Sequence, residues 1–349
     1  MKLRLHRLRS ACLVMLAIAP SLSPVSASEQ AANRAPVKLI LDTDMSGDCD
    51  DAGALALLHA LADRGECELL AVVTNRRDLT NASAAAVDAI NTYYGRGEIP
   101  IGTDKTGPTA FQRFSPYTTA LRDEFDHNML PDSEAADALD VYRQALRTAA
   151  DRSVTICSVG AFSNLAELIR EEPELIRTKV KSLVVMGGHF PQSNRREANI
   201  ATHVEAARLV AERWPGEIIW HGFEVGERLV TGARLKSTPQ TNPVRRAYEL
   251  RPMPGNKMSI DAGKPSYDQA AALFAVRGAE PKVWQVIPDG RVDIDDRGIT
   301  AWTPGSPRAP SATHSYVKIA SSPQQLARQI ENLMVAPPRQ SAQSAGSAE

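Results

Sequence analysis

Short apolar runs rich in β-branched residues alternate along the chain with longer stretches in which apolar residues recur at helical spacing. The runs that predict strands are Val37–Leu41, Leu69–Thr74, Ile99–Gly102, Val154–Val159, Ser182–Met186 and Glu217–Trp220. The stretches that predict helices are Asp51–Ala62, Asn81–Tyr94, Asp137–Ala150, Asn164–Arg170 and Thr202–Arg213. This alternation predicts an α/β fold with an open, mostly parallel sheet, flanking helices and a Rossmann-like core.

The length and composition fit one large domain better than two. The chain has 349 residues, of which 43% are hydrophobic, so it can bury a sizeable core. Two loop-rich segments, 103–136 and 232–265, are candidates for lids or for part of a second lobe, and 336–349 has the composition of a disordered tail. Because no internal repeat or clear linker divides the chain, we predict a single domain over 28–335.

The N-terminus has the pattern of a bacterial signal peptide. Four basic residues precede an apolar stretch from Ala11 to Ile18, and Val25-Ser26-Ala27 follows as a small-residue cleavage pattern. The apolar stretch is shorter than the roughly 20 residues that a membrane span needs. We expect residues 1–27 to be removed, which would leave a periplasmic or secreted protein without a membrane anchor.

Charge and cysteine content argue against two classes of protein. Without the four basic residues of the signal peptide, the mature chain has 36 basic and 41 acidic residues, a net charge near −5. Such a chain gives no electrostatic reason to bind nucleic acid. The three cysteines that remain, Cys49, Cys67 and Cys157, are too few and too scattered for a disulfide framework.

The stretch LILDTDMSGDCDDAGALALL, from Leu39 to Leu58, places five carboxylates between a predicted strand and a predicted helix. They are Asp42, Asp44, Asp48, Asp50 and Asp51. Like charges at this spacing repel strongly unless a cation or protons compensate them. Oxygen ligands suit Ca²⁺ or Mg²⁺, and calcium tolerates the irregular geometry of a loop better. The stretch therefore predicts a metal site, although Asp50 alone would be read as a helix cap.

Two known patterns fit this stretch only in part. In an EF-hand loop that begins at Asp42, the twelfth position would be Gly53 instead of a bidentate glutamate, and a strand precedes the loop. The second pattern is that of a metal-dependent phosphatase, with Asp42 as the nucleophile and Asp44 as the acid. It fits the strand before the loop but leaves three aspartates without a role. The residues alone keep the phosphatase open as an alternative.

Five segments together resemble the inosine-uridine preferring nucleoside hydrolase family, in a variant form associated with exported bacterial members. DTDMSGDCDDA has both ends of the family's D-x-D-P-G-x-D-D-A signature and two additional residues. The others are TICSVGAFSNLAEL (155–168), VVMGGHF (184–190), EANIATHVEAA (197–207) and SYDQAAALFAVRG (266–278), which are similar to later family motifs in the same order. The resemblance covers most of residues 37–278 and implies a nucleoside hydrolase-like fold.

The resemblance implies a calcium-dependent enzyme that hydrolyses the N-glycosidic bond of a nucleoside to give ribose and a free base. The calcium ligands would be Asp44, Asp51, the main-chain carbonyl of Val159, and Asp268. Asp44 would also act as the general base on the attacking water. Without the other motifs, Asp268 would be read as an N-terminal cap of a helix over Gln269–Val276.

The same resemblance implies contacts with the sugar. Asp50 would accept a hydrogen bond from the 2′-hydroxyl, with Asp48 as a second candidate because of the two additional residues in the loop. Asn194, Glu197 and Asn199 match sugar-binding positions of the family. One carboxylate and two amides on a loop suit the 3′- and 5′-hydroxyls.

The position before Asp268 departs from the family. Much of the family has a histidine there, which protonates the departing base, whereas this chain has Tyr267. A phenol with an ordinary pKa near 10 is a poorer acid than imidazolium, although it can donate a hydrogen bond or stack on a ring. His189 or His221 would be the other candidates for the acid.

Other polar residues near strand ends have supporting roles in this interpretation. Asp42 would support the loop, and Asn164 is read as a helix cap. The family's asparagine after the second strand can be matched to Asn75 or Asp78.

Taken together, the residues and the resemblance favour an exported, calcium-dependent N-glycoside hydrolase that acts on a nucleoside or glycoside and, by family analogy, forms a homo-oligomer. Two other functions remain open. One is a calcium-dependent carbohydrate-binding protein that kept the sugar pocket and lost turnover, and the other is the phosphatase that uses Asp42. Neither the preferred base nor the identity of the sugar follows from the sequence.

Overall fold

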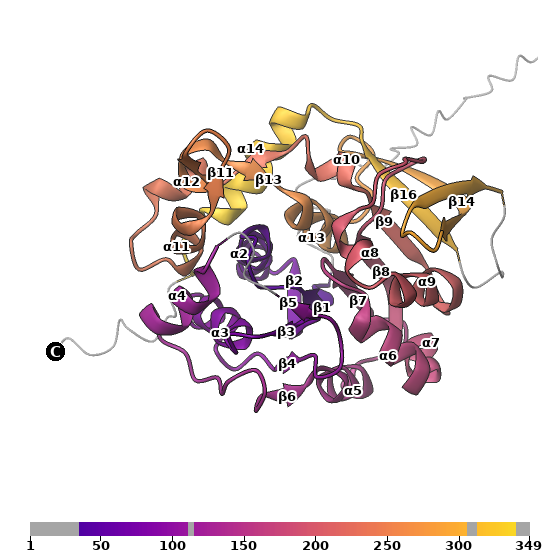
Figure 1. The fold of residues 1–349 in the computed structure, drawn as a ribbon, viewed down its shortest axis with the longest axis horizontal. Helices are drawn as coiled ribbons and strands as arrows, with labels where there is room; N and C mark the ends of the chain where they lie inside the picture. The colour runs from indigo at the N-terminus through magenta and orange to yellow at the C-terminus, as the bar shows by residue number, and fades with distance from the viewer. Residues whose placement is uncertain (1–34, 111–114, 306–312, 340–349) are drawn as a thin grey trace, which may run out of the picture. The chain divides into compact units, whose positions relative to one another are not determined.

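All six predicted strands form, and they lie in one sheet (Figure 1). The computed structural model describes residues 35–110, 115–305 and 313–339, so the predicted signal peptide and most of the predicted tail lie outside the described residues. In these ranges the strands of the sheet, in their order across it, are β15 (Thr300–Pro304), β14 (Trp284–Ile294), β16 (His314–Ile319), β9 (Ile218–His221), β8 (Val180–Met186), β7 (Val154–Ser158), β1 (Val37–Thr43), β2 (Cys67–Thr74), β4 (Ile101–Thr103) and β6 (Ala136–Asp137).

The sheet is parallel from β16 to β6, and among its described strands only β14 pairs antiparallel with its neighbours, β15 and β16. This confirms the predicted class. Short strand pairs outside the sheet are β3 (Arg77–Asp78) with β5 (Thr109–Ala110), β10 (Val230–Thr231) with β13 (Lys264–Pro265), and β11 (Pro252–Met253) with β12 (Lys257–Met258).

Helices fill the connections between the strands. They are α2 (Asp50–Asp63), α3 (Ser83–Tyr93), α4 (Tyr117–Glu124), α5 (Ala138–Thr148), α6 (Ser163–Glu171), α7 (Pro173–Lys179), α8 (Ala198–Thr202), α9 (Val204–Arg213), α10 (Phe223–Gly226), the 3₁₀ helix η1 (Ala233–Ser237), α11 (Pro243–Leu250), α12 (Ser259–Ala262), α13 (Tyr267–Arg277) and α14 (Pro323–Met334). None of the helices in the described ranges is long and apolar enough to cross a membrane.

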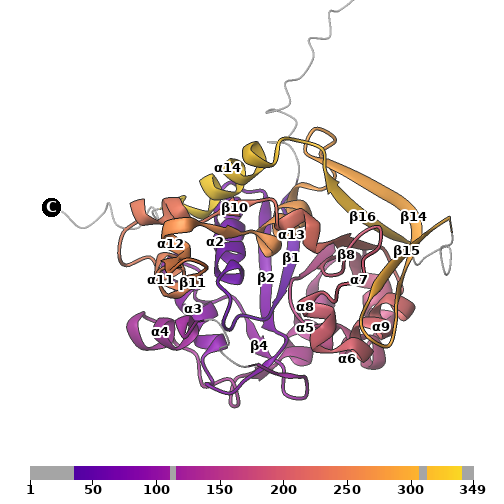
Figure 2. The same cartoon turned by 45° about the horizontal axis from the view of Figure 1, so that its top comes forward.

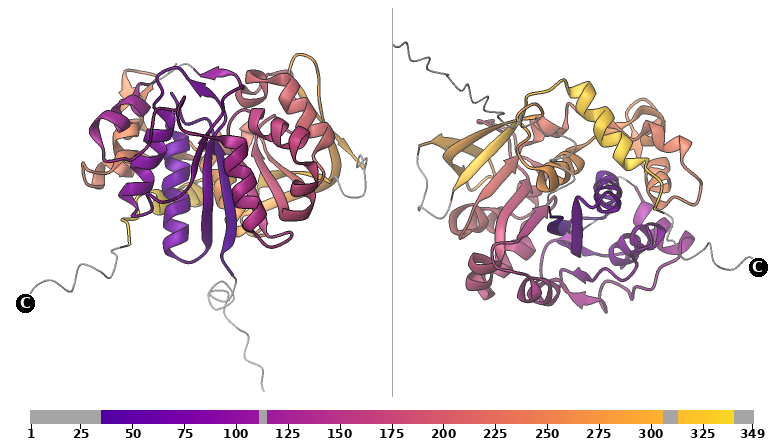
Figure 3. Two further views of the ribbon diagram at one scale, coloured as in Figure 1. Left: turned by 90° about the horizontal axis from the view of Figure 1, so that it is seen from below. Right: turned by 180° about the vertical axis from the view of Figure 1, so that it is seen from behind.

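Side chains of the central strands alternate between two hydrophobic cores, one on each face of the sheet. Leu39 and Leu41 of β1 point into the core formed with α2, α13 and α14, whereas Ile40 points into the core formed with α5, α6 and α9. Successive residues of a strand face opposite sides, so a strand covered on both faces reads as a continuous apolar run. Figure 2 shows α2 running alongside β2, and Figure 3 shows helices on both sides of the central strands.

The parallel arrangement brings the carboxyl ends of four strands to one edge of the sheet. Thr43, the last residue of β1, lies opposite Thr74, the last residue of β2. On the other side of β1, Asp42 lies opposite Ser158, the last residue of β7. The residues that follow β1, β2, β7 and β8 therefore meet at this edge, which is where ligands bind in open α/β sheets.

The sequence interpretation was wrong about the C-terminal third. Segment 232–265, expected to be loop-rich, contains η1, α11 and α12, and the strands β14, β15 and β16 and helix α14 were not predicted. β14 contains Pro288-Asp289-Gly290, which has the composition of a turn. The strand nevertheless continues through it, with an irregular register between Ile287 and Gly290 and with Asp289 at a φ of 60°.

Candidate active site

Asp42 is a residue of β1, next to its carboxyl end, and is fully buried. Tyr142 donates a hydrogen bond of 2.6 Å to one of its carboxylate oxygens, and the side-chain amide of Asn75 donates to the other. Burial raises the pKa of Asp42 to about 7. The carboxylate therefore ties β1 to α5 and to the residue after β2, and it is not placed as the free nucleophile that a phosphatase would need.

Asn75 is one of the two residues that the sequence left open for the family's asparagine. Its side-chain oxygen accepts a hydrogen bond of 2.9 Å from the main-chain N–H of Ala161, so it connects the end of β2 with the segment after β7. The competing residue, Asp78, instead accepts hydrogen bonds from the main-chain N–H groups of Thr80 and Ala82 in a local turn. Of the two candidates for the family's asparagine, Asn75 is thus the one that connects two strand ends of the sheet.

Asn164 does not cap a helix, which corrects the sequence interpretation. Helix α6 begins after Phe162, and the side-chain amide of Asn164 donates a hydrogen bond of 3.0 Å to the main-chain carbonyl of Thr74. Asn164 therefore ties α6 to the end of β2. A residue close to a helix start is read as a cap from sequence alone, because the neighbouring strand that binds it is distant along the chain.

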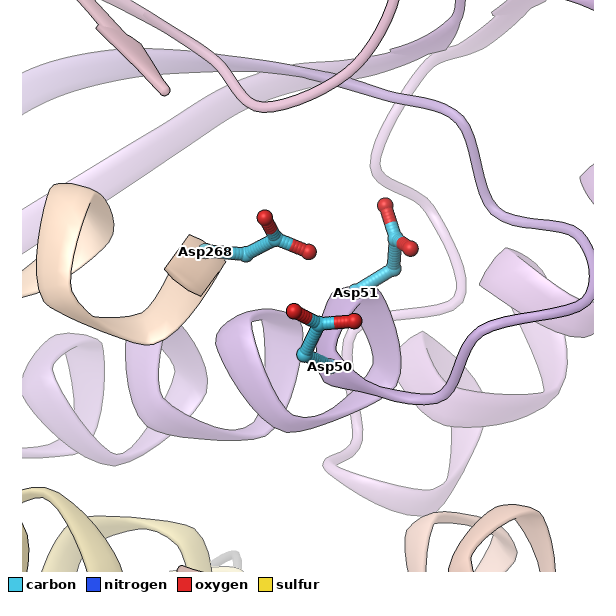
Figure 4. A group of neighbouring side chains, drawn as sticks. All are labelled: Asp50, Asp51 and Asp268. Atoms are coloured by element: carbon cyan, nitrogen blue, oxygen red, sulfur yellow. The ribbon is translucent and has the colours of Figure 1, made fainter. Parts of the chain in front are cut away.

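Three carboxylates form a group with the spacing of a metal site. Asp50, Asp51 and Asp268 each offer an oxygen within 4.8 Å of the oxygens of the other two, and all three are buried. Figure 4 shows Asp50 and Asp51 on the first turn of α2 and Asp268 on the first turn of α13, with their carboxylates gathered between the two helix starts. None of the three side chains caps its helix. The cap readings of Asp50 and Asp268 are therefore wrong.

Crowding makes this group a strong candidate for a cation. Burial, together with the neighbouring carboxylates, raises the pKa of both Asp51 and Asp268 well above the usual range. Thr43 donates a hydrogen bond to Asp51, but no lysine or arginine of the described residues pairs with Asp51 or Asp268. Oxygen ligands without a protein counter-charge fit a hard divalent cation.

Asp44 lies beside the group but pairs with a cation of the protein, Arg76. It also lies close to the segment after β7, because a Cβ atom at Gly160 would stand only 2.7 Å from an Asp44 carboxylate oxygen. Burial raises the pKa of Asp44, and the charge of Arg76 opposes this rise. Asp44 and Val159 are thus close in the structure, as the resemblance implies, although Asp44 is not one of the three grouped carboxylates.

Lys264 and Arg251 neutralise the other aspartates of the loop. The ammonium group of Lys264 lies 2.8 Å from Asp50 and 3.3 Å from Asp48, and the guanidinium of Arg251 lies 2.9 Å from Asp48. Lys264 is only 2% exposed, yet its pKa lies above the usual value, because the charges of Asp50 and Asp48 outweigh the effect of burial. The sequence interpretation missed these cations, since no motif marks them. Of the two candidates for the 2′-hydroxyl, Asp50 is the one in the metal-like group.

A cavity of about 810 Å³ opens above these residues. Its lining includes Asp44, Asp48, Asp50, Asp51, Asp268, Val159, Asn199 and Tyr267 together with Arg76, Arg196, Arg251, Lys264, Phe223 and the exposed face of α8. The rings of Phe223 and Tyr267 stack with their centroids 4.9 Å apart. Most of the residues that the resemblance assigned to the site therefore face one space.

Two of the predicted sugar-binding residues are placed differently. Glu197 is buried and accepts hydrogen bonds from the main-chain N–H groups of Asn199 and Ile200, so it caps α8 and holds Asn199 in place. Asn194 is exposed, and both residues lie outside the cavity lining. Asn199 does line the cavity, and its amide donates a hydrogen bond of 2.9 Å to the carbonyl of Val159. Arg196, which the sequence interpretation did not select, lines the cavity from the same segment.

The histidines are not placed to protonate a leaving base. His221 is buried against the rings of Phe274 and Trp284, where burial lowers its pKa to about 3. His189 packs against Phe223 and, like His221, lies outside the cavity lining. Tyr267 does line the cavity, and burial raises its pKa to about 12. Its hydroxyl therefore stays protonated near neutral pH and remains a hydrogen-bond donor.

The fold and the site have relatives among known proteins. The family model described as inosine-uridine preferring nucleoside hydrolase matches residues 39–322. An inosine-uridine preferring nucleoside hydrolase of Crithidia fasciculata is 28% identical over 232 residues, which are 62% of this chain and 70% of the relative. A non-specific ribonucleoside hydrolase, RihC, of Klebsiella pneumoniae is 25% identical over 282 residues, 77% and 86% of the two chains.

Solved structures show the same fold. A plant nucleoside hydrolase, PpNRh1, superposes with a TM-score of 0.68 at 19% identity and covers 86% of this chain and 100% of its own. A purine-preferring ribonucleoside hydrolase from Gardnerella vaginalis gives a TM-score of 0.65 at 18% identity, covering 85% and 98%. At these identities the likeness shows that the fold is shared.

The chain belongs to the inosine-uridine preferring nucleoside hydrolase family. It is therefore an N-glycoside hydrolase whose reaction is cleavage of the N-glycosidic bond of ribonucleosides. This assignment supports turnover over the alternative of a carbohydrate-binding protein without activity. It also argues against the phosphatase, in agreement with the buried, hydrogen-bonded state of Asp42.

Proposed function

We propose that the protein is an exported, calcium-dependent ribonucleoside hydrolase. The observation that carries this proposal is the buried group of Asp50, Asp51 and Asp268 at the floor of the cavity. Two of these carboxylates lack a cationic partner in the described part of the chain, and their pKa values are raised by burial and mutual repulsion. A divalent cation would relieve this repulsion.

Asp51 and Asp268 would be the main carboxylate ligands of calcium, with Asp44 and the carbonyl of Val159 beside them. Bound calcium would orient the sugar hydroxyls and the attacking water and lower the pKa of that water. Calcium is preferred over magnesium here because the donor set is an irregular group of carboxylates from a loop and two helix starts.

Asp44 is the base that we assign to the attacking water. It lines the cavity, and Arg76 beside it favours the ionised carboxylate that can accept a proton. Lys264 holds Asp50 at the edge of the grouped carboxylates, and Asp50 would use its second oxygen for the 2′-hydroxyl. The carboxylates of Asp44 and Asp50 would also stabilise the positive charge that develops at the anomeric carbon.

The base and the rest of the sugar would contact the other walls of the cavity. The stacked rings of Phe223 and Tyr267 offer an aromatic face to the nucleobase, and the Tyr267 hydroxyl can donate a hydrogen bond to it. Asn199 is the amide in reach of a sugar hydroxyl, while Glu197 acts through Asn199 by fixing the start of α8. Asn194, which is exposed, is no longer proposed as a sugar contact.

The test is release of free base and reducing sugar from a panel of inosine, uridine and nitrophenyl riboside. Wild-type protein should cleave at least one of them with calcium present and lose this activity after chelation, with recovery when calcium is restored. Full turnover in the chelated protein would contradict calcium dependence. Absence of cleavage of the whole panel in the calcium-loaded protein would contradict the proposed function.

Export and assembly are part of the same proposal. The basic and apolar pattern of residues 1–27 supports export, and N-terminal sequencing of the protein from a bacterial periplasm should begin at Ser28. A start at Met1 in that fraction would contradict cleavage. A homo-oligomer is proposed by family analogy, and light scattering of the purified protein would test it.

A further inference from the structure

We propose that the site takes ribosides that carry an anionic group, such as a phosphate, at the 5′ position, and that Arg196 contacts this group. The inference rests on the proposed function and narrows its substrate class. It comes from the charges around the cavity, the position of Arg196 and the size of the cavity.

The charges around the cavity do not suit a neutral ligand once a divalent cation is bound. Five aspartates and four cationic side chains of the described residues line it. When all of them are ionised, the lining carries one negative charge, and a divalent cation would change this to one positive charge. An anionic substrate would balance that charge, whereas a neutral nucleoside would not.

Arg196 is the cation that the protein leaves uncompensated at this cavity. Arg76 pairs with Asp44, Arg251 pairs with Asp48, and Lys264 lies between Asp48 and Asp50. Arg196, by contrast, makes a hydrogen bond of 3.4 Å to the carbonyl of Ala201, and no carboxylate of the described chain pairs with it. Its guanidinium is therefore available to a ligand.

The position of Arg196 matches the 5′ substituent of a riboside, because the other walls of the cavity would contact the sugar hydroxyls and the base. The grouped carboxylates occupy the region between the starts of α2 and α13, and the Phe223–Tyr267 pair forms a second region. The bond from Arg196 to Ala201 places the guanidinium along α8, whose residues Ala198, Asn199, Ala201 and Thr202 form a third wall. With sugar hydroxyls at the carboxylates and the base on the aromatic pair, the 5′ substituent is the part that remains for this third wall.

Cavity size and side-chain chemistry agree with a phosphate there. A volume of about 810 Å³ lies in the upper part of the range for small-molecule sites, so it leaves room beyond a nucleoside. Arginine binds phosphate through two parallel N–H donors and stays charged at all relevant pH values. The same loop segment that the resemblance assigns to the 5′-hydroxyl thus carries a group suited to an anion instead.

Binding of ribose 5-phosphate and of ribose to the calcium-loaded protein tests the inference without turnover. We expect ribose 5-phosphate to bind about tenfold more tightly than ribose, and Arg196→Gln to remove this difference. Arg177→Gln, on the surface helix α7 and paired with Glu174, removes the same charge away from the cavity and should keep the difference. Equal binding of the two sugars, or an unchanged preference in Arg196→Gln, would overturn the proposal.

Turnover separates this inference from the proposed function. The calcium-loaded wild type should cleave inosine 5′-monophosphate or uridine 5′-monophosphate with a higher kcat/KM than the matching nucleoside, and Arg196→Gln should reverse that order. Cleavage of nucleosides that is faster than cleavage of their monophosphates would sink the inference and leave the proposed function standing. Tight binding of ribose 5-phosphate without cleavage of any riboside would support the anion contact and contradict the proposed function.

Discussion

The aspartates around the cavity divide into two neighbouring groups that are neutralised differently. Asp44 and Asp48 pair with Arg76 and Arg251, and Lys264 supplies a further cation between Asp48 and Asp50. Asp51 and Asp268 lie beside them without a cationic partner in the described residues, and their pKa values rise well above the usual range. Identical side chains close together thus differ in their surroundings, because the protein supplies a cationic counter-charge to one group and, among the described residues, none to the other.

Asp44 belongs to the neutralised group but is assigned a chemical role, so its substitution tests the division most directly. Asp44→Asn should lower kcat by about three orders of magnitude, because the amide keeps the shape and cannot accept the proton. Steady-state kinetics on the best substrate would measure this loss. Asp261→Asn, which removes a surface carboxylate paired with Lys236, is the control and should be silent. Near wild-type turnover in Asp44→Asn would place the base elsewhere.

Calcium should stabilise the unpaired group in a pH-dependent way. Burial and the neighbouring carboxylates raise the pKa of Asp51 and of Asp268 well above the usual range, and these acids favour the folded state when protonated. In the chelated protein this stabilisation is fully present below the ordinary carboxyl pKa of about 4 and is lost as the pH rises toward the raised pKa values of the folded protein. The chelated protein should therefore unfold at a lower temperature near neutral pH than near about pH 5.

Calcium should remove this loss of stability near neutral pH, because it competes with protons for the same carboxylates. Saturating calcium should raise the unfolding temperature by about 5 °C or more at neutral pH, and by much less near about pH 5. Thermal unfolding with and without chelator at both pH values measures the effect. Asp268→Asn is the matched variant, and a full calcium response in that protein would contradict the assignment of Asp268 as a ligand.

Lys264→Met removes the lysine that lies between Asp48 and Asp50, so Asp50 loses its cationic partner. Loss of the ammonium leaves Asp50 beside Asp48 and the grouped carboxylates, and it should destabilise the chelated protein by about 3 kcal/mol. The same change should tighten calcium binding, because one repelling charge is removed from the site. Chemical denaturation and calcium titration would measure the two effects, with Lys236→Met, an exposed ion-paired lysine, as control. Weaker calcium binding in Lys264→Met would show that Lys264 holds a ligand in place instead of competing with the metal.

The smallest expected effect concerns Tyr267, at the border of the aromatic wall. Tyr267→Phe keeps the ring stack with Phe223 and removes a hydrogen-bond donor. Turnover of inosine or uridine should fall about tenfold and that of nitrophenyl riboside by less than about twofold, because an activated leaving group needs less help. Comparison of kcat/KM on both substrates measures whether the Tyr267 hydroxyl assists the leaving base. Equal losses would mean that Tyr267 only shapes the cavity.

Local sequence patterns predicted the part of the fold that lies around β1 and the carboxylates that follow it. Buried parallel strands are continuous apolar runs, and the carboxyl ends of such strands meet by geometry, so the carboxylates after β1, among them Asp44 and Asp51, could be expected near one point. The sequence resemblance added Asp268, Val159 and Asn199. β14 could not be predicted in the same way, because Pro288-Asp289-Gly290 has the local chemistry of a turn and tertiary pairing overrides it.

The counter-charges escaped prediction for a different reason. Lys264 and Arg251 follow the acidic loop by some 200 residues and belong to no pattern, so that only the folded chain brings them to Asp48 and Asp50. Glu197 was selected for its residue type and its place in a motif, yet its carboxylate binds main-chain N–H groups. A carboxylate at a helix start can either cap or bind a ligand, and the sequence does not distinguish the two.

Gly160 limits how this enzyme can be altered by design or drift. A methyl group there would stand 2.5 Å from the Asn75 side-chain oxygen and 2.7 Å from Asp44, so any other residue would displace two side chains of the candidate site. Arg196, in contrast, is exposed and makes one weak bond within the protein. Variation that retunes which riboside is accepted can therefore accumulate along the rim near α8 while the floor at Gly160 tolerates none, and a library aimed at new substrates should be built there.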